Sequence, residues 1–163
     1  IDLARETGHS RFPVLDVDDT VVGTVHVKHA VALPPSERAT TRVKHIMVVG
    51  HYGCGGVQAA MENRTLGLID NWLRHVQDVQ NKHAGQLNAL APELRLARLC
   101  ELNVIEQVLN VTQTTVVRGA WERGQNLTVH GWVYALQDGL LRDLNVGSSD
   151  VAESLDANAR ATK

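Results

Sequence analysis

The feature that most constrains the fold of this chain is a short apolar run, residues 46–50, that leads directly into a glycine-rich turn. A continuously apolar run of this length is typical of a strand that is buried in a parallel sheet. The turn, residues 51–56, reads His-Tyr-Gly-Cys-Gly-Gly, and a helix is predicted to start from it over residues 55–63. The glycines let the backbone fold tightly around whatever the turn holds. A strand, a turn and a helix in direct succession predict an α/β fold.

His51 and Cys54 in this turn form a candidate half of a zinc site. Imidazole and thiolate are ligands that zinc prefers, and a separation of three residues on a turn lets both reach one ion at about 2.0–2.3 Å. For an isolated pair, a hydrogen-bonded histidine beside a buried thiol is the more frequent arrangement. The sequence on either side of the pair favours the zinc interpretation.

Length and composition fit one compact domain, because 163 residues of which 44% are hydrophobic can bury a substantial core. The formal net charge of -2 and the absence of a lysine- or arginine-rich run argue against nucleic acid and membrane surfaces as partners. No apolar stretch approaches the roughly 20 residues that span a bilayer. The two cysteines do not make a disulfide framework, and no charged-then-apolar leader is present, so we expect a cytoplasmic setting.

A junction is predicted at residues 33–41, where two prolines and a polar run interrupt any regular pattern. Before the junction, residues 11–16 and 20–27 are rich in strand-forming residues and flank a turn at residues 17–19, which predicts a hairpin. After the junction, strand and helix patterns alternate.

Two long helices are predicted in the middle of the chain. Pro92 is expected to open the second of them, and Cys100 lies on its apolar stripe, where we interpret it as a small buried hydrophobic residue rather than a ligand. The helical spacing that carries the first prediction is that of Leu68, Trp72, Val76 and Val79, and the stripe of the second is Leu94, Ala97, Cys100 or Leu102, Ile105 and Leu109.

The last third of the chain is predicted to contain a short helix, a strand and a tail. The helix covers residues 115–122 and ends at Gly124, and the strand covers residues 127–134. Residues 147–163 are polar and short of large apolar side chains, so we expect a mobile tail.

Several blocks of sequence extend the pattern of the turn and point together to one enzyme family. Through them, residues 43–150 resemble the β-class carbonic anhydrases, and closely the bacterial branch of that class. In chain order, the matching blocks are residues 45–60, 67–73, 100–108, 120–125, 129–134 and 138–144.

This resemblance implies both a fold and a reaction. The fold is a three-layer α/β domain with a mainly parallel sheet flanked by helices, in which residues 46–50 form the central strand. The reaction is the reversible hydration of carbon dioxide to bicarbonate by a zinc lyase, with His51 and Cys54 as metal ligands. The resemblance also implies a homodimer or a higher homo-oligomer.

The N-terminal segment resembles a different family. Residues 7–16 and 18–30 are similar to part of a cystathionine-β-synthase-type (CBS) domain, of the kind found in hemolysin-C-like magnesium and cobalt efflux proteins. The sequence therefore predicts a CBS-like fragment and junction at residues 1–42, a carbonic-anhydrase-like part at 43–150 and a polar tail at 151–163. The combination indicates a chimeric or recombined chain with a foreign N-terminal segment.

One zinc-binding element of the family has no clear counterpart here. β-Class carbonic anhydrases carry a Cys-x-Asp-Ser-Arg segment before the His-x-x-Cys turn, and its cysteine is a third zinc ligand. A partial match is residues 7–13, in which His9 takes the place of the aspartate and Arg11 that of the arginine. A site of His9, His51, Cys54 and water would be chemically acceptable, with Arg11 as the candidate catalytic residue.

Two further arrangements remain open. Two chains that each present His51 and Cys54 could share one structural Cys2His2 site across a twofold axis. His26, His29 and His45 are alternative donors, although each is more readily interpreted as an ordinary strand or surface histidine.

The sequence therefore leaves three functions. The first is a carbonic-anhydrase-type zinc lyase that is impaired or inactive because half of its zinc site is missing. The second is a non-catalytic chimeric scaffold, and the third, less favoured, is a CBS-type nucleotide-binding module.

Overall fold

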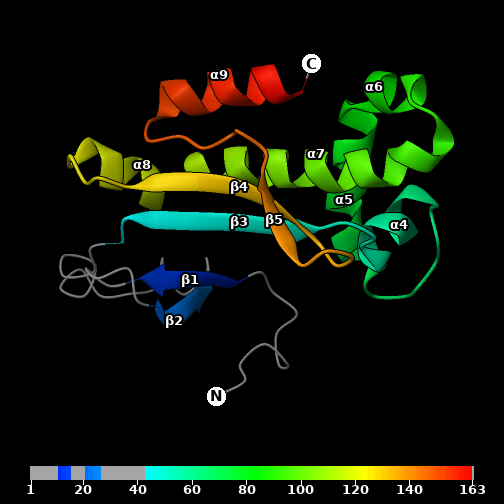
Figure 1. Cartoon of the computed structure of the whole chain (residues 1–163), viewed down its shortest axis with the longest axis horizontal. Helices are drawn as coiled ribbons and strands as arrows, with labels where there is room; N and C mark the ends of the chain where they lie inside the picture. The colour runs from blue at the N-terminus through cyan, green and yellow to red at the C-terminus, as the bar shows by residue number, and fades with distance from the viewer. Residues whose placement is uncertain (1–10, 16–20, 27–42, 163) are drawn as a thin grey trace.

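The computed structural model describes residues 11–15, 21–26 and 43–162 (Figure 1). The elements in chain order are β1 (Arg11–Leu15), β2 (Val21–His26), β3 (His45–His51), α4 (Gly55–Met61), α5 (Asp70–Lys82), α6 (Ala84–Ala89), α7 (Pro92–Thr112), α8 (Thr115–Glu122), β4 (Thr128–Ala135), β5 (Leu140–Asp143) and α9 (Val151–Ala161).

The sheet formed by β3, β4 and β5 is mainly parallel. β3 and β4 run in parallel through seven residue pairs, whereas β5 joins β4 through four antiparallel pairs. β4 lies in the middle of this sheet and β3 at its edge, so the expectation that residues 46–50 form the central strand is wrong for the described strands. The reason is the short connection at residues 136–139, which returns the chain directly to the free side of β4.

Helix α7 packs across one face of the sheet and holds the core together. It contacts β3 and β4 on one side and α9 on another (Figure 1). Alternate residues of β4 are buried, as expected for a strand with one covered face. Leu99, Leu102 and Ile105 of α7 are fully buried beneath this face. The predicted α/β fold with a parallel-dominated sheet flanked by helices is confirmed.

The close approach of α7 to the sheet requires glycine at position 131. A Cβ atom added there would collide with Val146 Cγ2 and lie 2.8 Å from Val108 Cγ2. Both neighbours are β-branched and have little rotamer freedom to move away.

Replacing Gly131 with alanine is therefore expected to destabilise the fold by about 1–3 kcal/mol, the usual range for overpacking a core. Denaturant unfolding followed by circular dichroism measures this change. Gly85→Ala is the matched control, because nothing lies within 4 Å of a Cβ atom at that position of α6. The control should gain up to about 1 kcal/mol from the helix propensity of alanine. An unchanged unfolding midpoint for Gly131→Ala would contradict the packing described here.

The first two predicted helices are present with shifted starts or ends. α4 ends at Met61 rather than at residue 63, where Asn63 adopts a φ of 52°. α5 begins only at Asp70, because the Asp70 carboxylate accepts a hydrogen bond of 2.9 Å from the Leu66 amide and holds the preceding loop. Leu68, expected on the helix stripe, precedes the helix and is 90% exposed. The side chains of α5 that are buried are Leu73, Val76 and Val79.

The later helices and strands follow the sequence prediction closely. α7 starts at Pro92 as expected, but Leu94 of its predicted stripe is exposed while Cys100 is only 2% exposed. α8 occupies the predicted residues, and Gly124 follows it with a φ of 71°. β4 is shifted by one residue from the predicted strand.

The expectation of a mobile C-terminal tail is wrong. Residues 151–161 form helix α9, whose first turn is capped by the Asp150 carboxylate at 2.8 Å from the Glu153 amide. Ala157 is 1% exposed, and Ser148 pairs with Val129 of β4. Small side chains allow this segment to pack closely, so the shortage of large apolar residues did not prevent docking.

The N-terminal hairpin is confirmed as an antiparallel pair of β1 and β2. β1 lies beside β3 (Figure 1). The predicted turn at residues 17–19 and the junction at residues 33–41 lie outside the described residues. None of the helices among the described residues combines the length and the apolar character that a membrane span needs.

Candidate metal site

The predicted ligand pair lies where β3 ends and α4 begins. His51 is the last residue of β3, and Cys54 immediately precedes the first residue of α4. Gly53 between them has a φ of 67°, which a residue with a side chain rarely adopts. The turn is fixed at both ends, because the Tyr52 amide donates to the Tyr134 carbonyl and the Gln58 amide donates to the Cys54 carbonyl, each at 2.9 Å.

The imidazole of His51 makes a hydrogen bond through one of its two ring nitrogens. Its Nδ1 lies 3.0 Å from the carbonyl oxygen of Tyr52. A carbonyl oxygen can only accept, so Nδ1 carries the proton and Nε2 keeps a free lone pair. A backbone carbonyl in this position is a common partner of zinc-binding histidines. Because His51 is exposed and Cys54 is a half-buried free thiol, both donors are available to an ion.

The donor types fit zinc, but the described part of the chain does not complete the site. No group of three or more histidine, cysteine, aspartate or glutamate residues is placed to hold a metal among the described residues. Zinc uses four protein ligands in structural sites and normally three in catalytic ones. The turn therefore carries His51 and Cys54, and no third ligand joins them among the described residues.

The other sequence candidates do not join this pair in the described structure. His9 lies outside the described residues, and Arg11 begins β1, where the side chain is not described. Both therefore stay predictions. The same holds for His26, the last residue of β2, and for His29, which lies outside the described residues.

His45 is engaged elsewhere on the sheet. Its Nδ1 lies 3.0 Å from Nε2 of His130 on the neighbouring strand. His45 and His51 are six residues apart on one strand, which separates them by about 20 Å at about 3.3 Å per residue. His45 therefore cannot share an ion with His51 of the same chain.

The prediction that Cys100 is a small buried residue is confirmed. Cys100 lies against the turn. Burial raises the pKa of its thiol, while hydrogen bonds from the backbone of Cys54 and Gly53 act in the opposite direction. The net shift is upward, which favours the neutral thiol. A buried neutral thiol supports the turn by packing and is a poor metal ligand.

Tyr52 connects the turn to charged residues of α7 that the sequence analysis did not identify. Its hydroxyl donates to Glu101 Oε1 at 2.6 Å, and Glu101 Oε2 accepts from Arg98 at 2.9 Å. Burial, followed by the hydrogen bond and charge of Glu101, raises the pKa of Tyr52 to about 12. The only sequence signal was the spacing of Arg98 and Glu101, which equally fits a pair on a solvated helix face.

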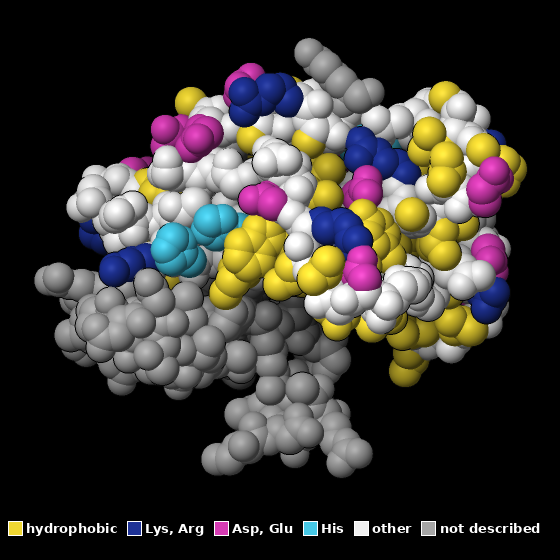
Figure 2. Space-filling view, in the orientation of Figure 1, with side chains coloured by type: hydrophobic (Ala, Val, Ile, Leu, Met, Phe, Trp, Pro, Cys, Tyr) yellow, Lys and Arg dark blue, Asp and Glu magenta, His cyan; other side chains and the backbone are white. Residues whose placement is uncertain are grey.

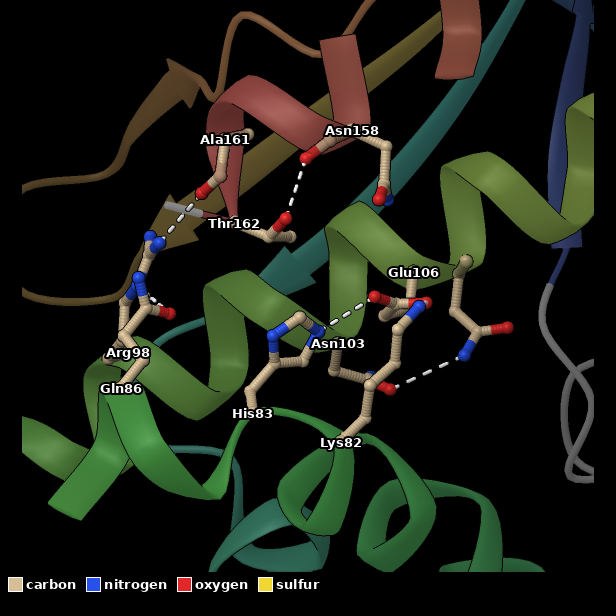
Figure 3. A network of polar contacts seen from close by, with 10 residues as sticks. Lys82, His83, Gln86, Arg98, Asn103, Glu106, Asn158, Ala161 and Thr162 are labelled. Atoms are coloured by element: carbon tan, nitrogen blue, oxygen red, sulfur yellow. Dashed lines mark hydrogen bonds and ion pairs between the residues drawn. The ribbon is translucent and has the colours of Figure 1, made fainter. Parts of the chain in front are cut away.

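A second polar cluster joins α5 and α6 to α7 (Figure 3). Glu106, only 7% exposed, accepts from Lys82 Nζ at 2.8 Å and from His83 Nε2 at 2.7 Å. Burial acts to raise the pKa of Glu106, but the hydrogen bonds from Lys82 and His83 together outweigh it, and the net pKa is lowered. The cluster supports the helices behind the turn and contains neither ligand.

A carbonic anhydrase family model matches residues 38–141 of the chain. A carbonic anhydrase of Emericella nidulans is 49% identical over 106 residues, which are 64% of this chain and 46% of that protein. A carbonic anhydrase of Pseudomonas aeruginosa is 31% identical over 113 residues, which are 68% of this chain and 50% of that protein. The chain thus spans about half the length of these curated relatives.

The chain is also similar to solved structures of β-carbonic anhydrases. A Coccomyxa β-carbonic anhydrase in complex with acetazolamide superposes with a TM-score of 0.66 at 37% identity, covering 74% of this chain and 54% of that one. A structure of tetrameric β-carbonic anhydrases from Sordaria macrospora gives a TM-score of 0.63 at 30% identity, covering 74% and 62%.

The family match begins at residue 38 and gives no support to the CBS-like interpretation of residues 1–33. The chimeric origin and the boundary at residue 42 therefore stay predictions.

Proposed function

Because the chain belongs to the β-class carbonic anhydrase family, we propose that its His51–Cys54 turn supplies two zinc ligands to a site for the reversible hydration of carbon dioxide. The observation that carries this proposal is the hydrogen bond from His51 Nδ1 to the Tyr52 carbonyl, which leaves Nε2 free to bind a metal in the turn that also carries Cys54. When bound, zinc makes a hydroxide available at neutral pH, which the hydration of carbon dioxide requires.

The residues of this chain would hold and orient the ion. His51 would bind the ion through Nε2, because Nδ1 donates to the Tyr52 carbonyl, and Cys54 would bind it through its sulfur. The left-handed Gly53 sets the spacing between the two donors. Tyr52 stays protonated at neutral pH, so its hydroxyl serves as a hydrogen-bond donor to Glu101 rather than as a base.

We further propose that this chain by itself hydrates carbon dioxide far more slowly than a site with a full ligand set. Two protein ligands hold zinc weakly, and a catalytic site normally has three. His9 is the candidate third ligand and Arg11 the candidate residue for ordering water and substrate. The alternative is a Cys2His2 site shared by two chains, which would be structural because no position stays open for water.

A homo-oligomer is part of the same proposal. Large apolar side chains are exposed on the hairpin that joins β4 to β5 and around the start of α5: Leu136, Leu140, Leu141, Leu66, Leu68 and Ile69. Figure 2 shows apolar side chains gathered near this end of the sheet. Exposed apolar patches of this kind mark interaction surfaces, and the similar Sordaria macrospora proteins are tetrameric.

Zinc content tests the proposal directly. The chain is stripped of metal, reloaded with zinc and analysed for zinc per chain, while light scattering gives the mass of the same sample. About one equivalent per chain supports a site completed within the chain, and about half an equivalent in a dimer supports the shared site. Less than about 0.1 equivalent would contradict zinc binding by this turn.

Carbon dioxide hydration by the zinc-loaded chain separates the remaining possibilities. A slow rate above that of buffer, absent from the stripped protein, is expected for the site completed by His9. A rate equal to that of buffer with zinc bound would instead favour the structural site.

A further inference from the structure

Glu101 is held from both sides by charged and polar groups. Its Oε1 accepts from the Tyr52 hydroxyl at 2.6 Å, and its Oε2 accepts from Arg98 at 2.9 Å. The side chains of Glu101 and Arg98 are each 23% exposed, so this pair is largely shielded from water. A charged hydrogen bond of this length, partly removed from solvent, is among the stronger polar interactions in a protein.

Arg98 is itself fixed by two other elements. It donates to the Ala161 carbonyl at the end of α9 at 2.7 Å and to the Gln86 side chain of α6 at 3.3 Å. Figure 3 shows Arg98 between Gln86 and Ala161. The carboxylate that meets Tyr52 therefore has little freedom to move.

Tyr52 links the fixed Glu101 carboxylate to the ligand pair. Its hydroxyl donates a hydrogen bond to Glu101, and its backbone carbonyl accepts a hydrogen bond from His51 Nδ1. The same carbonyl therefore determines which ring nitrogen of His51 is free to bind a metal. A displacement of Tyr52 would release His51 from this tautomer and orientation.

We propose that Glu101 is a positioning residue for the His51–Cys54 ligand pair, acting through Tyr52 and braced by Arg98. This inference rests on the proposed zinc-binding function of the turn. Partners of metal ligands of this type typically change metal affinity by about 10- to 100-fold when they are removed.

Cobalt(II) binding to the full chain tests the proposal, because cobalt replaces zinc and reports ligand geometry through its visible spectrum. Glu101→Ala and Tyr52→Phe are each expected to weaken cobalt affinity by about 10- to 100-fold and to alter the spectrum. The double variant should lose little more cobalt affinity than either single variant, because both substitutions break the same hydrogen bond between Tyr52 and Glu101. Glu101→Gln should restore part of the affinity, because its amide oxygen can still accept from Tyr52.

The matched control is Glu106→Gln, which alters a carboxylate of the same helix that is hydrogen-bonded to Lys82 and His83. It should lower the unfolding midpoint and leave cobalt affinity unchanged. An equal loss of affinity in the Glu101 and Glu106 variants would mean that only overall stability matters, and would overturn the proposal.

The tautomer of His51, measured by nitrogen-15 NMR of the metal-free chain, provides a readout that does not depend on metal binding. The wild-type chain should show the Nδ1-protonated form, and Glu101→Ala a mixture of both forms. If Glu101→Ala changes neither the His51 tautomer nor the cobalt affinity, the positioning role of Glu101 is contradicted, while the proposed zinc-binding function is not. A wild-type chain that binds no cobalt contradicts the proposed function, while the tautomer shift still decides whether Glu101 positions His51.

Discussion

Replacing Cys54 with serine is expected to remove most of the zinc affinity of the chain. Serine keeps the size of the side chain but lacks the readily ionised soft donor that zinc prefers. Since losing a partner of a ligand already costs about 10- to 100-fold in affinity, losing the ligand itself should cost more than about 100-fold. Competition with a chromophoric chelator measures the change. Any carbon dioxide hydration by the zinc-loaded chain should disappear with it.

Cys100→Ala is the control for this prediction, because it removes the other thiol of the described structure and no ligand. Burial keeps the Cys100 thiol neutral, so this variant should retain the thiolate-to-cobalt absorption of the wild-type chain. Equal zinc affinity in the wild-type and Cys54→Ser chains would show that the turn is not a metal site. Loss of the thiolate signal in Cys100→Ala rather than in Cys54→Ser would show that Cys100, and not Cys54, is the metal ligand.

Replacing Glu106 with alanine is expected to cause the largest loss of stability, about 3 kcal/mol. The substitution leaves the buried His83 without its carboxylate partner, and removing one member of a buried pair typically costs about 3–5 kcal/mol. The lower end applies because the Lys82 side chain is 54% exposed and can turn to water. Denaturant unfolding of the metal-free chain measures the change.

Glu122→Ala is the matched control, an exposed glutamate at the end of α8. Its effect should stay within about 0.5 kcal/mol, as is usual for surface substitutions. A similar small effect for Glu106→Ala would mean that the cluster adds nothing to stability.

The contribution of Glu106 to the stability of the fold depends on pH, and the direction of that dependence follows from its pKa. The pKa of Glu106 is lowered in the folded chain from its ordinary value of 4.5. A lowered carboxyl pKa stabilises the fold above that ordinary value, and the contribution is lost as the pH falls through the folded pKa. The stability difference between wild type and Glu106→Gln should therefore shrink as the pH falls below about 4.5. A difference that grows on acidification would contradict the assignment.

Much of the fold could be predicted from sequence because its signals are local. Pro92 marks the start of α7, and the apolar run before the turn predicts β3. The order of strands in the sheet is not local, since β4 becomes central only when β5 folds back onto it. The docking of α9 was missed for a related reason, because the buried contact of Ala157 depends on the surface that α7 presents.

The sequence by itself determined the chemistry of the candidate site. His51 and Cys54 lie three residues apart, so their donor types, their spacing and the glycine between them are all visible in one short turn. Only the tertiary structure decided what orients these donors. Glu101 lies 49 residues from Tyr52 along the chain, and the two meet because α7 packs against β3 beside the turn. Such a contact depends on the packing of distant elements, and no local pattern in the sequence encodes it.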